Sequence, residues 1–185
     1  MAYSDSRGAF RAIVMGTVAM AIVVTAANVL VRYPINNWMT WGAFVYPLSF
    51  LVTDLTNRRL GPQQARRVVY AGFFFALWLS LFLATPRIAA ASLSAFLVAQ
   101  LLDVHIFDRL RRAKWWRAPF VSSSTASALD TVVFFTLAFA GTGLPWVTWG
   151  LGAYVVKLGM ALLLLLPFRV LLDATRPTLE PAVDS

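Results

Sequence analysis

The sequence predicts an all-α membrane protein, a six-transmembrane-helix bundle with both termini cytoplasmic, and three observations lead to this prediction. First, 59% of the 185 residues are hydrophobic and only 13% are charged, and the mean hydropathy is +0.71, which is outside the range of soluble domains. Second, the apolar residues form six runs of about 20 residues, the length that spans a bilayer core. Third, basic residues are concentrated in alternate connectors between these runs.

The six runs predict the helices in chain order, within a single transmembrane domain over 1–185. The first run follows Arg7 and Arg11, as the apolar part of a signal peptide would, but at about 20 residues it is too long for one and long enough to span. Pro47 interrupts the second run and Asp54 ends it, so a broken or partly re-entrant helix is expected there. The predicted helices cover residues 12–31, 38–56, 68–85, 88–107, 119–141 and 145–168, and residues 173–185 form a polar C-terminal tail.

The formal net charge of +8 would suggest nucleic-acid binding in a soluble protein, but its distribution indicates a membrane topology signal. Thirteen Lys and Arg residues lie before the first run, after the second, fourth and sixth runs, whereas Arg32 and Arg87 alone lie on the other side. This bias predicts cytoplasmic termini and an even number of spans, with the lipid bilayer and no nucleic acid as a partner. With no cysteine and one histidine, neither a disulfide framework nor a multi-histidine metal site is available, and no cofactor is expected.

Small residues recur every fourth position in the first run, at Thr17, Ala21 and Thr25. Such a stripe lets another helix approach closely. Packing inside the bundle is the favoured interpretation, and contact with a partner subunit, such as a homodimer, is the alternative.

Two ionisable residues fall near the middle of the last two predicted helices. Asp130 lies about 11 residues into one helix and Lys157 about 12 residues into the other, which places each about 16–18 Å from a membrane face. A charge at that depth costs at least about 2.5 kcal/mol, so such residues are usually paired and functional. Because a short connector joins the two helices, they should pack antiparallel, and we predict an Asp130–Lys157 ion pair.

Polar and aromatic residues also share faces of two predicted helices. Together they predict a cavity that suits a planar, hydrogen-bonding solute, because aromatic faces stack and carboxylates or amides form directed hydrogen bonds. The alternative is that the polar groups only bond neighbouring helices to one another. One face carries Ser123, Ser127, Asp130 and Phe134, and the other carries Phe96, Gln100, Asp103 and Phe107.

Two further residues are candidates for gating or coupling. His105, the sole histidine, lies near the cytoplasmic end of the fourth predicted helix, where a hydrated or packed side chain is the favoured alternative to a proton relay. Asp54 could instead pair locally with Arg58, four residues later. For an enzyme we find no nucleophile with a base placed to activate it, so an enzyme is the poorer interpretation.

Four segments resemble the bacterial queuosine precursor transporter family, also called the vitamin uptake transporter family. The most specific motifs within them are FLVTDLTNRRLG, QLLDVHIFDRL and LDTVVFF, and the resemblance covers most of the chain. The segments are TWGAFVYPLSFLVTDLTNRRLGPQQARR (40–67), RIAAASLSAFLVAQLLDVHIFDRLRR (87–112), WWRAPFVSSSTASALDTVVFF (115–135) and KLGMALLLLLPFRVLL (157–172).

This resemblance implies a six-helix, multi-pass importer of the bacterial inner membrane that carries 7-deazaguanine precursors of queuosine, chiefly 7-cyano-7-deazaguanine. The chain departs from the family pattern at Ser127, where relatives carry Asn, near Ala153, where they carry an acidic residue, and in a shorter external connector. The motif positions that the resemblance carries over are Asp54, Gln100, Asp103, His105, Asp130, Thr131 and Lys157.

The chemistry of a deazaguanine suggests roles for these groups. A carboxylate, Asp103 or Asp130, could accept N1–H and the 2-amino group together, while Gln100 or Lys157 donates to O6. Stacking on the flat rings would come from aromatic side chains. A stand-alone carrier is the main hypothesis, and the alternatives are the substrate-capture subunit of an ATP-driven uptake complex and, less favoured, a membrane hydrolase. The stacking candidates are Trp41, Phe44, Phe96 and Phe107.

Overall fold

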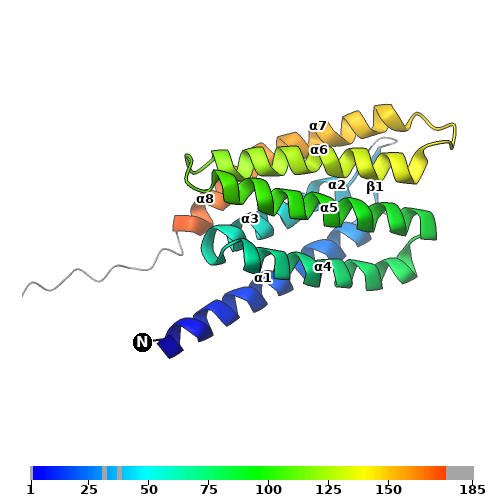
Figure 1. Ribbon diagram of the computed structural model, residues 1–185. Coiled ribbons are helices and arrows are strands. Elements are labelled where there is room, and N and C mark those ends of the chain that lie inside the picture. Colours follow the sequence, from blue (N-terminus) through cyan, green and yellow to red (C-terminus); the bar gives the residue numbers. More distant parts are fainter. Residues whose placement is uncertain (1, 31–32, 37–38, 174–185) are drawn as a thin grey trace, which may run out of the picture.

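The computed structural model describes residues 2–30, 33–36 and 39–173, and it is a bundle of long helices (Figure 1). The predicted tail, apart from residue 173, and residues 31 and 38 at two predicted helix ends lie outside the described residues. The helices are α1 (Ala2–Leu30), α2 (Gly42–Val45), α3 (Leu48–Leu60), α4 (Pro62–Leu83), α5 (Pro86–Leu110), α6 (Arg117–Phe139), α7 (Trp146–Leu163) and α8 (Leu165–Asp173), and a short antiparallel pair of strands joins β1 (Pro34–Asn36) to β2 (Met39–Thr40).

Within the described residues, five helical segments are long and apolar enough to cross a membrane. These are Phe10–Leu30, Pro62–Leu83, Pro86–Leu110, Arg117–Phe139 and Trp146–Asp173. The exception among the six predicted spans is 38–56. There the chain forms β2, the four-residue α2 and the 13-residue α3, which is shorter than the roughly 20 residues of a full span.

Proline explains two of the helix breaks. Pro47 directly precedes α3, and the proline ring cannot donate the hydrogen bond that would continue α2 into α3. The run predicted as one helix over 145–168 is likewise divided at Leu164 into α7 and α8. Pro167 lies in the first turn of α8, where a missing N–H is tolerated, and its ring excludes a continuous helix with Leu163.

Helix ends are set by local sequence signals. α4 and α5 each begin with proline, whose fixed φ suits the first helical position. The Thr85 hydroxyl accepts a hydrogen bond from the Ile88 amide at 3.5 Å and caps α5. The α6–α7 turn uses Gly141 and Gly143 at φ 79° and 76°, a region that favours glycine.

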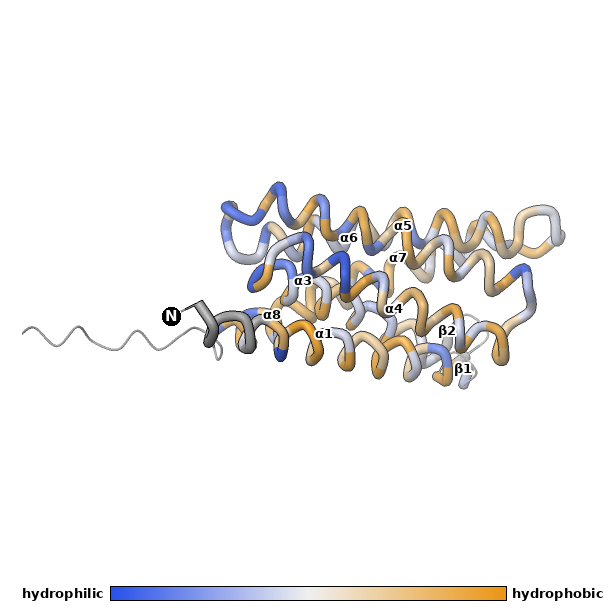
Figure 2. The backbone as a smooth tube through the Cα atoms, turned by 60° about the horizontal axis from the view of Figure 1, so that its bottom comes forward, coloured by the Kyte–Doolittle hydropathy of each residue, from blue (hydrophilic) through white to orange (hydrophobic). Residues whose placement is uncertain are grey.

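The short helix α3 lies inside the bundle. It packs against α1, α4, α5 and α6, while α5 packs against α6 and α6 against α7. The start of α1 and the helix α8 lie at the same end of the bundle (Figure 1). Figure 2 shows hydrophilic residues gathered at this end, around the α5–α6 connection and the end of α3. The hydrophilic end and the two ends of the described chain therefore coincide.

The main apolar core fills the space between α1, α4 and α5. Gly72 permits close approach of α1 to α4, since a Cβ atom there would lie 2.5 Å from the Met20 Cγ. On α1, the inward face is centred on Met20 and Val24, so the predicted small-residue stripe lies at its margin, half-buried. The core residues are Met20, Val24, Ala65, Val68, Val69, Ala76, Phe96 and Val104.

Candidate functional site: a buried polar network beside a small cavity

Asp130 and Lys157 form a buried ion pair between α6 and α7. The Lys157 ammonium donates to Asp130 Oδ2, and the two side chains are only 11% and 6% exposed. Lys157 also donates to the Thr131 hydroxyl at 3.1 Å. The antiparallel packing of two helices joined by a short turn brings these positions together, which confirms the ion pair predicted from the sequence.

Tyr46 completes this network and was missed by the sequence analysis. Its hydroxyl donates to Asp130 Oδ1 at 2.9 Å, and Lys157 Nζ lies 5.4 Å from its ring centroid, a cation–π contact. Both carboxylate oxygens of Asp130 therefore have a donor. A tyrosine beside a proline inside an apolar run was a usable signal, because a buried phenol needs a polar partner.

Gln100 belongs to a second polar network, which joins α5 to α3. Its amide nitrogen donates to Ser49 Oγ at 2.8 Å, and its amide oxygen accepts from Thr53 Oγ1 at 2.7 Å. All three side chains are fully buried. In this conformation Gln100 is satisfied by α3, as the alternative interpretation of the polar stripes anticipates.

Asp54 and Asp103 form a third polar cluster with two serines of α6. The Ser122 and Ser123 hydroxyls donate to Asp54 at 3.3 and 3.1 Å. Asp103 is buried at the facing position of α5, where Thr53 bonds to Gln100 and Asn57 bonds to the Val104 carbonyl. The local Asp54–Arg58 pair considered from the sequence is wrong, because Arg58 donates to the Arg111 carbonyl instead.

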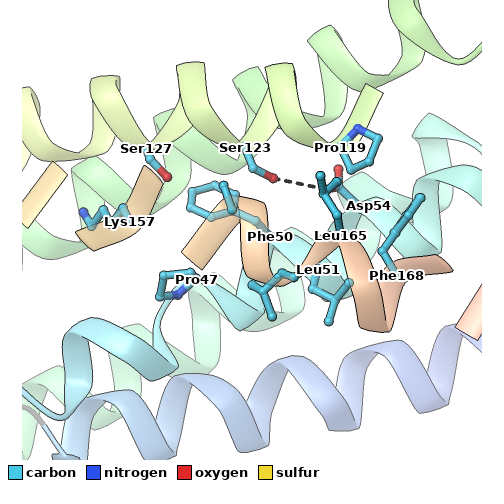
Figure 3. Close-up of a pocket in the computed structure, with 12 residues that line it drawn as sticks. Pro47, Phe50, Leu51, Asp54, Pro119, Ser123, Ser127, Lys157, Leu165 and Phe168 are labelled. Carbon is cyan, nitrogen blue, oxygen red and sulfur yellow. Dashed lines mark hydrogen bonds between the residues drawn. The ribbon is translucent and has the colours of Figure 1, made fainter. Parts of the chain in front are cut away.

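A small cavity lies between Lys157 of the ion pair and Asp54 of the carboxyl–serine cluster. Lys157 and Ser127 lie at one end of it and Asp54 and Phe168 at the other (Figure 3). Its volume of about 20 Å³ is room for about one water molecule. A bicyclic ring does not fit, so this conformation is closed around its polar groups. The lining residues are Pro47, Phe50, Leu51, Asp54, Pro119, Ser123, Ser127, Lys157, Ala161, Leu164, Leu165 and Phe168.

The aromatic residues predicted to stack on a substrate do not share one site. Phe96 packs edge-on against Tyr46 at 6.4 Å, whereas Phe107 packs against Phe168 at 6.2 Å. Eleven helical positions separate the two residues, about 16 Å, so they cannot clamp the same ring. Trp41 is 54% exposed, and its ring centroid lies 6.3 Å from that of Phe44. Neither residue lines the cavity.

Other predicted residues are distributed over the same helices. His105 is exposed on α5, and Phe134 is half-buried. Ser127 lines the cavity, whereas Asp103 is fully buried and does not line it. The structure thus brings Ser127 and Lys157 to one end of the cavity, with Asp130 bonded to Lys157, whereas Gln100 bonds to α3 and does not line the cavity.

Arginines fasten both ends of the bundle through main-chain carbonyls. At the hydrophilic end, Arg58 donates to the Arg111 carbonyl at the end of α5 and Arg59 donates to the Leu171 carbonyl of α8 at 2.6 Å. At the opposite end, Arg87 donates to carbonyls at the end of α6, at 3.0 and 2.6 Å. These bonds supply side-chain donors to carbonyls near helix ends, where few intrahelical donors remain.

Long apolar helices around buried carboxylates and an ammonium define a class of protein. Ionisable groups at membrane depth mark substrate and ion pathways, so the chain is a multi-pass protein of the transporter class. Sequence comparison gives the particular family. The profile described as "Putative vitamin uptake transporter" matches residues 40–84 and 77–172, and the chain belongs to this family.

Three bacterial relatives are named queuosine precursor transporters, two of them as probable. The chain is 35% identical to the queuosine precursor transporter of Escherichia coli K12 over 182 aligned positions, covering 82% of each chain. It is 36% identical to the probable queuosine precursor transporter of Haemophilus influenzae (69% of this chain, 66% of the relative) and 28% identical to that of Bacillus subtilis (67% of each). No solved structure matches the chain. With its apolar helices, this membership makes it a multi-pass protein of the bacterial inner membrane.

Proposed function

We propose that this chain imports 7-deazaguanine precursors of queuosine, chiefly 7-cyano-7-deazaguanine, by a carrier mechanism. The names of three relatives support the substrate class. The single observation that carries the proposal in the structure is the pair of donors on Asp130. Tyr46 and Lys157 each donate to one of its oxygens, and N1–H and the 2-amino group of a deazaguanine present two donors side by side in the same way.

Substrate binding is therefore an exchange of donors. The base replaces the Tyr46 hydroxyl and the Lys157 ammonium on Asp130, and the released ammonium turns to O6. Asp130 and Lys157 both keep a partner in this exchange and only the Tyr46 hydroxyl is released, which limits the desolvation penalty. Gln100 and Asp103 are the alternative partners for O6 and for the two donors, respectively, if the helices rearrange.

The closed cavity supports a carrier that alternates between open states. Pro47 and Leu164, at the two helix breaks, both line the cavity. Interrupted helices beside a midplane site are common in transporters, where the breaks absorb the movement. Movement of α3 and α8 about these breaks would widen the cavity enough for a purine-like ring.

The proposed topology has six spans with both termini in the cytoplasm. The α2–α3 segment counts as the second span because α3 is enclosed by other helices and does not need the length of a lipid-exposed helix. Arg58 and Arg59 lie in the last turn of α3, and Arg111 caps the end of α5. These helix ends lie at the hydrophilic end of the bundle, where α1 starts and α8 lies (Figures 1 and 2). Placing that end inside satisfies the thirteen-to-two bias of basic residues.

Restoration of queuosine in tRNA tests the function in cells. A strain that cannot make the precursor and lacks its own importer is supplied with 7-cyano-7-deazaguanine and expresses the chain. The parent chain should restore queuosine and Asp130→Asn should not. Asp108→Asn, a control at an exposed carboxylate of α5, should restore it fully. Failure of the parent chain, when present in the membrane, would refute the function.

A further inference from the structure

Two buried carboxyl groups lie side by side at the end of the cavity away from Lys157. Asp54 of α3 is 2% exposed and Asp103 of α5 is fully buried. Hydrogen bonds from Thr53 to Gln100 and from Asn57 to the Val104 carbonyl hold α3 against α5 at the adjoining positions. Buried carboxylates normally have a cation or several hydrogen-bond donors as partners.

The donors near the pair all serve Asp54. Ser122 and Ser123 donate to its two oxygens, whereas neither oxygen of Asp103 receives a hydrogen bond from a described residue. A proton on Asp103 resolves this, because a neutral carboxyl is a donor and Asp54 is an adjacent acceptor. One proton thus satisfies the carboxyl that is otherwise unpaired.

No cation among the described residues neutralises the pair. Lys157 of α7 lines the same cavity but is bonded to Asp130, which Tyr46 of α2–α3 also contacts. Arg58 and Arg111 bond to main-chain carbonyls and Asn57. The remaining described ionisable side chains on the helices that pack against α3 or α5 are exposed; they are Arg11 of α1, Arg66, Arg67 and Tyr70 of α4, Arg87, His105, Asp108 and Arg109 of α5, Arg117 of α6, and Arg169 and Asp173 of α8.

We propose that Asp54 and Asp103 bind one exchangeable proton that couples import to the proton gradient. The inference rests on the proposed function and adds its energy source. With the proton bound, α3 closes against α5 and α6 through the shared hydrogen bond. When the proton leaves toward the cytoplasm, two adjacent negative charges in a low-dielectric site repel each other and favour opening of α3. One proton then enters with each substrate molecule.

The purified full chain in liposomes tests the coupling, with labelled 7-cyano-7-deazaguanine outside and the membrane potential clamped at zero. With the outside one pH unit more acidic, accumulation of up to about tenfold over equilibrium is expected for one proton per substrate, and a protonophore should abolish it. Asp103→Asn should lose this accumulation over equilibrium. Asp108→Asn is the matched control and should accumulate normally.

A milder variant gives a second readout. Ser123→Ala removes one donor to the Asp54 carboxylate, so the proton is held more tightly and the pH of half-maximal uptake should rise by about half a unit to one unit. An unchanged or lower midpoint contradicts the proposal, and so does gradient-driven accumulation by Asp103→Asn.

The outcomes separate the coupling from the function. A parent chain that binds and equilibrates the substrate without responding to pH keeps the proposed function and overturns the coupling. Accumulation driven by a sodium gradient at constant pH overturns the choice of the proton. A parent chain that neither binds nor transports overturns the proposed function, and this inference with it.

Discussion

The Lys157 ammonium on α7 donates to the Asp130 carboxylate on α6, and this ion pair lies buried at the end of a cavity too small for a substrate. The carboxylate is held by the same two groups that must release it for a purine-like base to bind. The pair therefore stabilises the closed state and also forms the recognition site.

Breaking the ion pair on one side should destabilise the protein. Asp130→Asn or Lys157→Met alone leaves the partner without its counter-charge, so the free energy of unfolding should fall by about 3–5 kcal/mol. The double variant removes both charges and should recover most of that loss, without recovering uptake. Thermal unfolding of the four proteins in one detergent measures this. Single variants as stable as the parent would show that the pair contributes little.

Tyr46→Phe should tighten substrate binding. The variant keeps the ring and removes the hydroxyl that competes with the base for Asp130 Oδ1. A hydrogen bond to a charged group contributes about 1.5–3 kcal/mol, so the dissociation constant should fall by roughly tenfold to hundredfold, since 1.4 kcal/mol corresponds to a factor of ten. Equilibrium binding to purified protein measures it. Weaker binding would mean that the hydroxyl contacts the bound base.

Gln100→Leu should affect folding more than substrate recognition. The change leaves Ser49 and Thr53 without their amide partner, and each unsatisfied buried group costs about 1–3 kcal/mol. Unfolding temperature should fall, while the KM for uptake by the folded fraction stays the same. A large increase in KM at normal stability would instead place Gln100 in the substrate site.

Two glycine substitutions should differ in their effect on the free energy of unfolding. Gly72→Ala places a Cβ atom 2.5 Å from the Met20 Cγ, whereas Gly152→Ala meets nothing within 4 Å. The first should lower the free energy of unfolding by about 1–3 kcal/mol, and the second should leave it unchanged or raise it by up to about 1 kcal/mol. Adding Met20→Ala to Gly72→Ala should relieve the clash. Equal effects of both glycine changes would contradict the close α1–α4 packing.

Much of this fold could be predicted because apolar run length and helical period are local properties. They predicted six spans, five of which correspond to helical segments long enough to cross a membrane, and a short connector was enough to pair Asp130 with Lys157. The second segment was harder to predict from run length. Because other helices enclose α3, it does not need the length of a helix that spans the bilayer in contact with lipid. The division at Leu164 follows from Pro167, a local signal that the apolar run obscured.

The site was less predictable, because it depends on which faces of non-adjacent helices meet. The inward stripe on α5 was recognisable, yet Gln100 bonds to α3 and Asp103 lies beside Asp54, and no spacing within α5 distinguishes these outcomes. Tyr46 was missed because its partner lies 84 residues away. Phe96 and Phe107 share a face, but their separation along the helix gives them different neighbours.

Uptake of labelled 7-cyano-7-deazaguanine into liposomes that contain only this chain tests the central claim most directly. We predict saturable uptake that unlabelled 7-cyano-7-deazaguanine inhibits and that Asp130→Asn abolishes, with Asp108→Asn as the active control. Vesicles that bind the compound but take up no more than protein-free vesicles would contradict the carrier and favour a capture subunit; undiminished uptake by Asp130→Asn would contradict the proposed site.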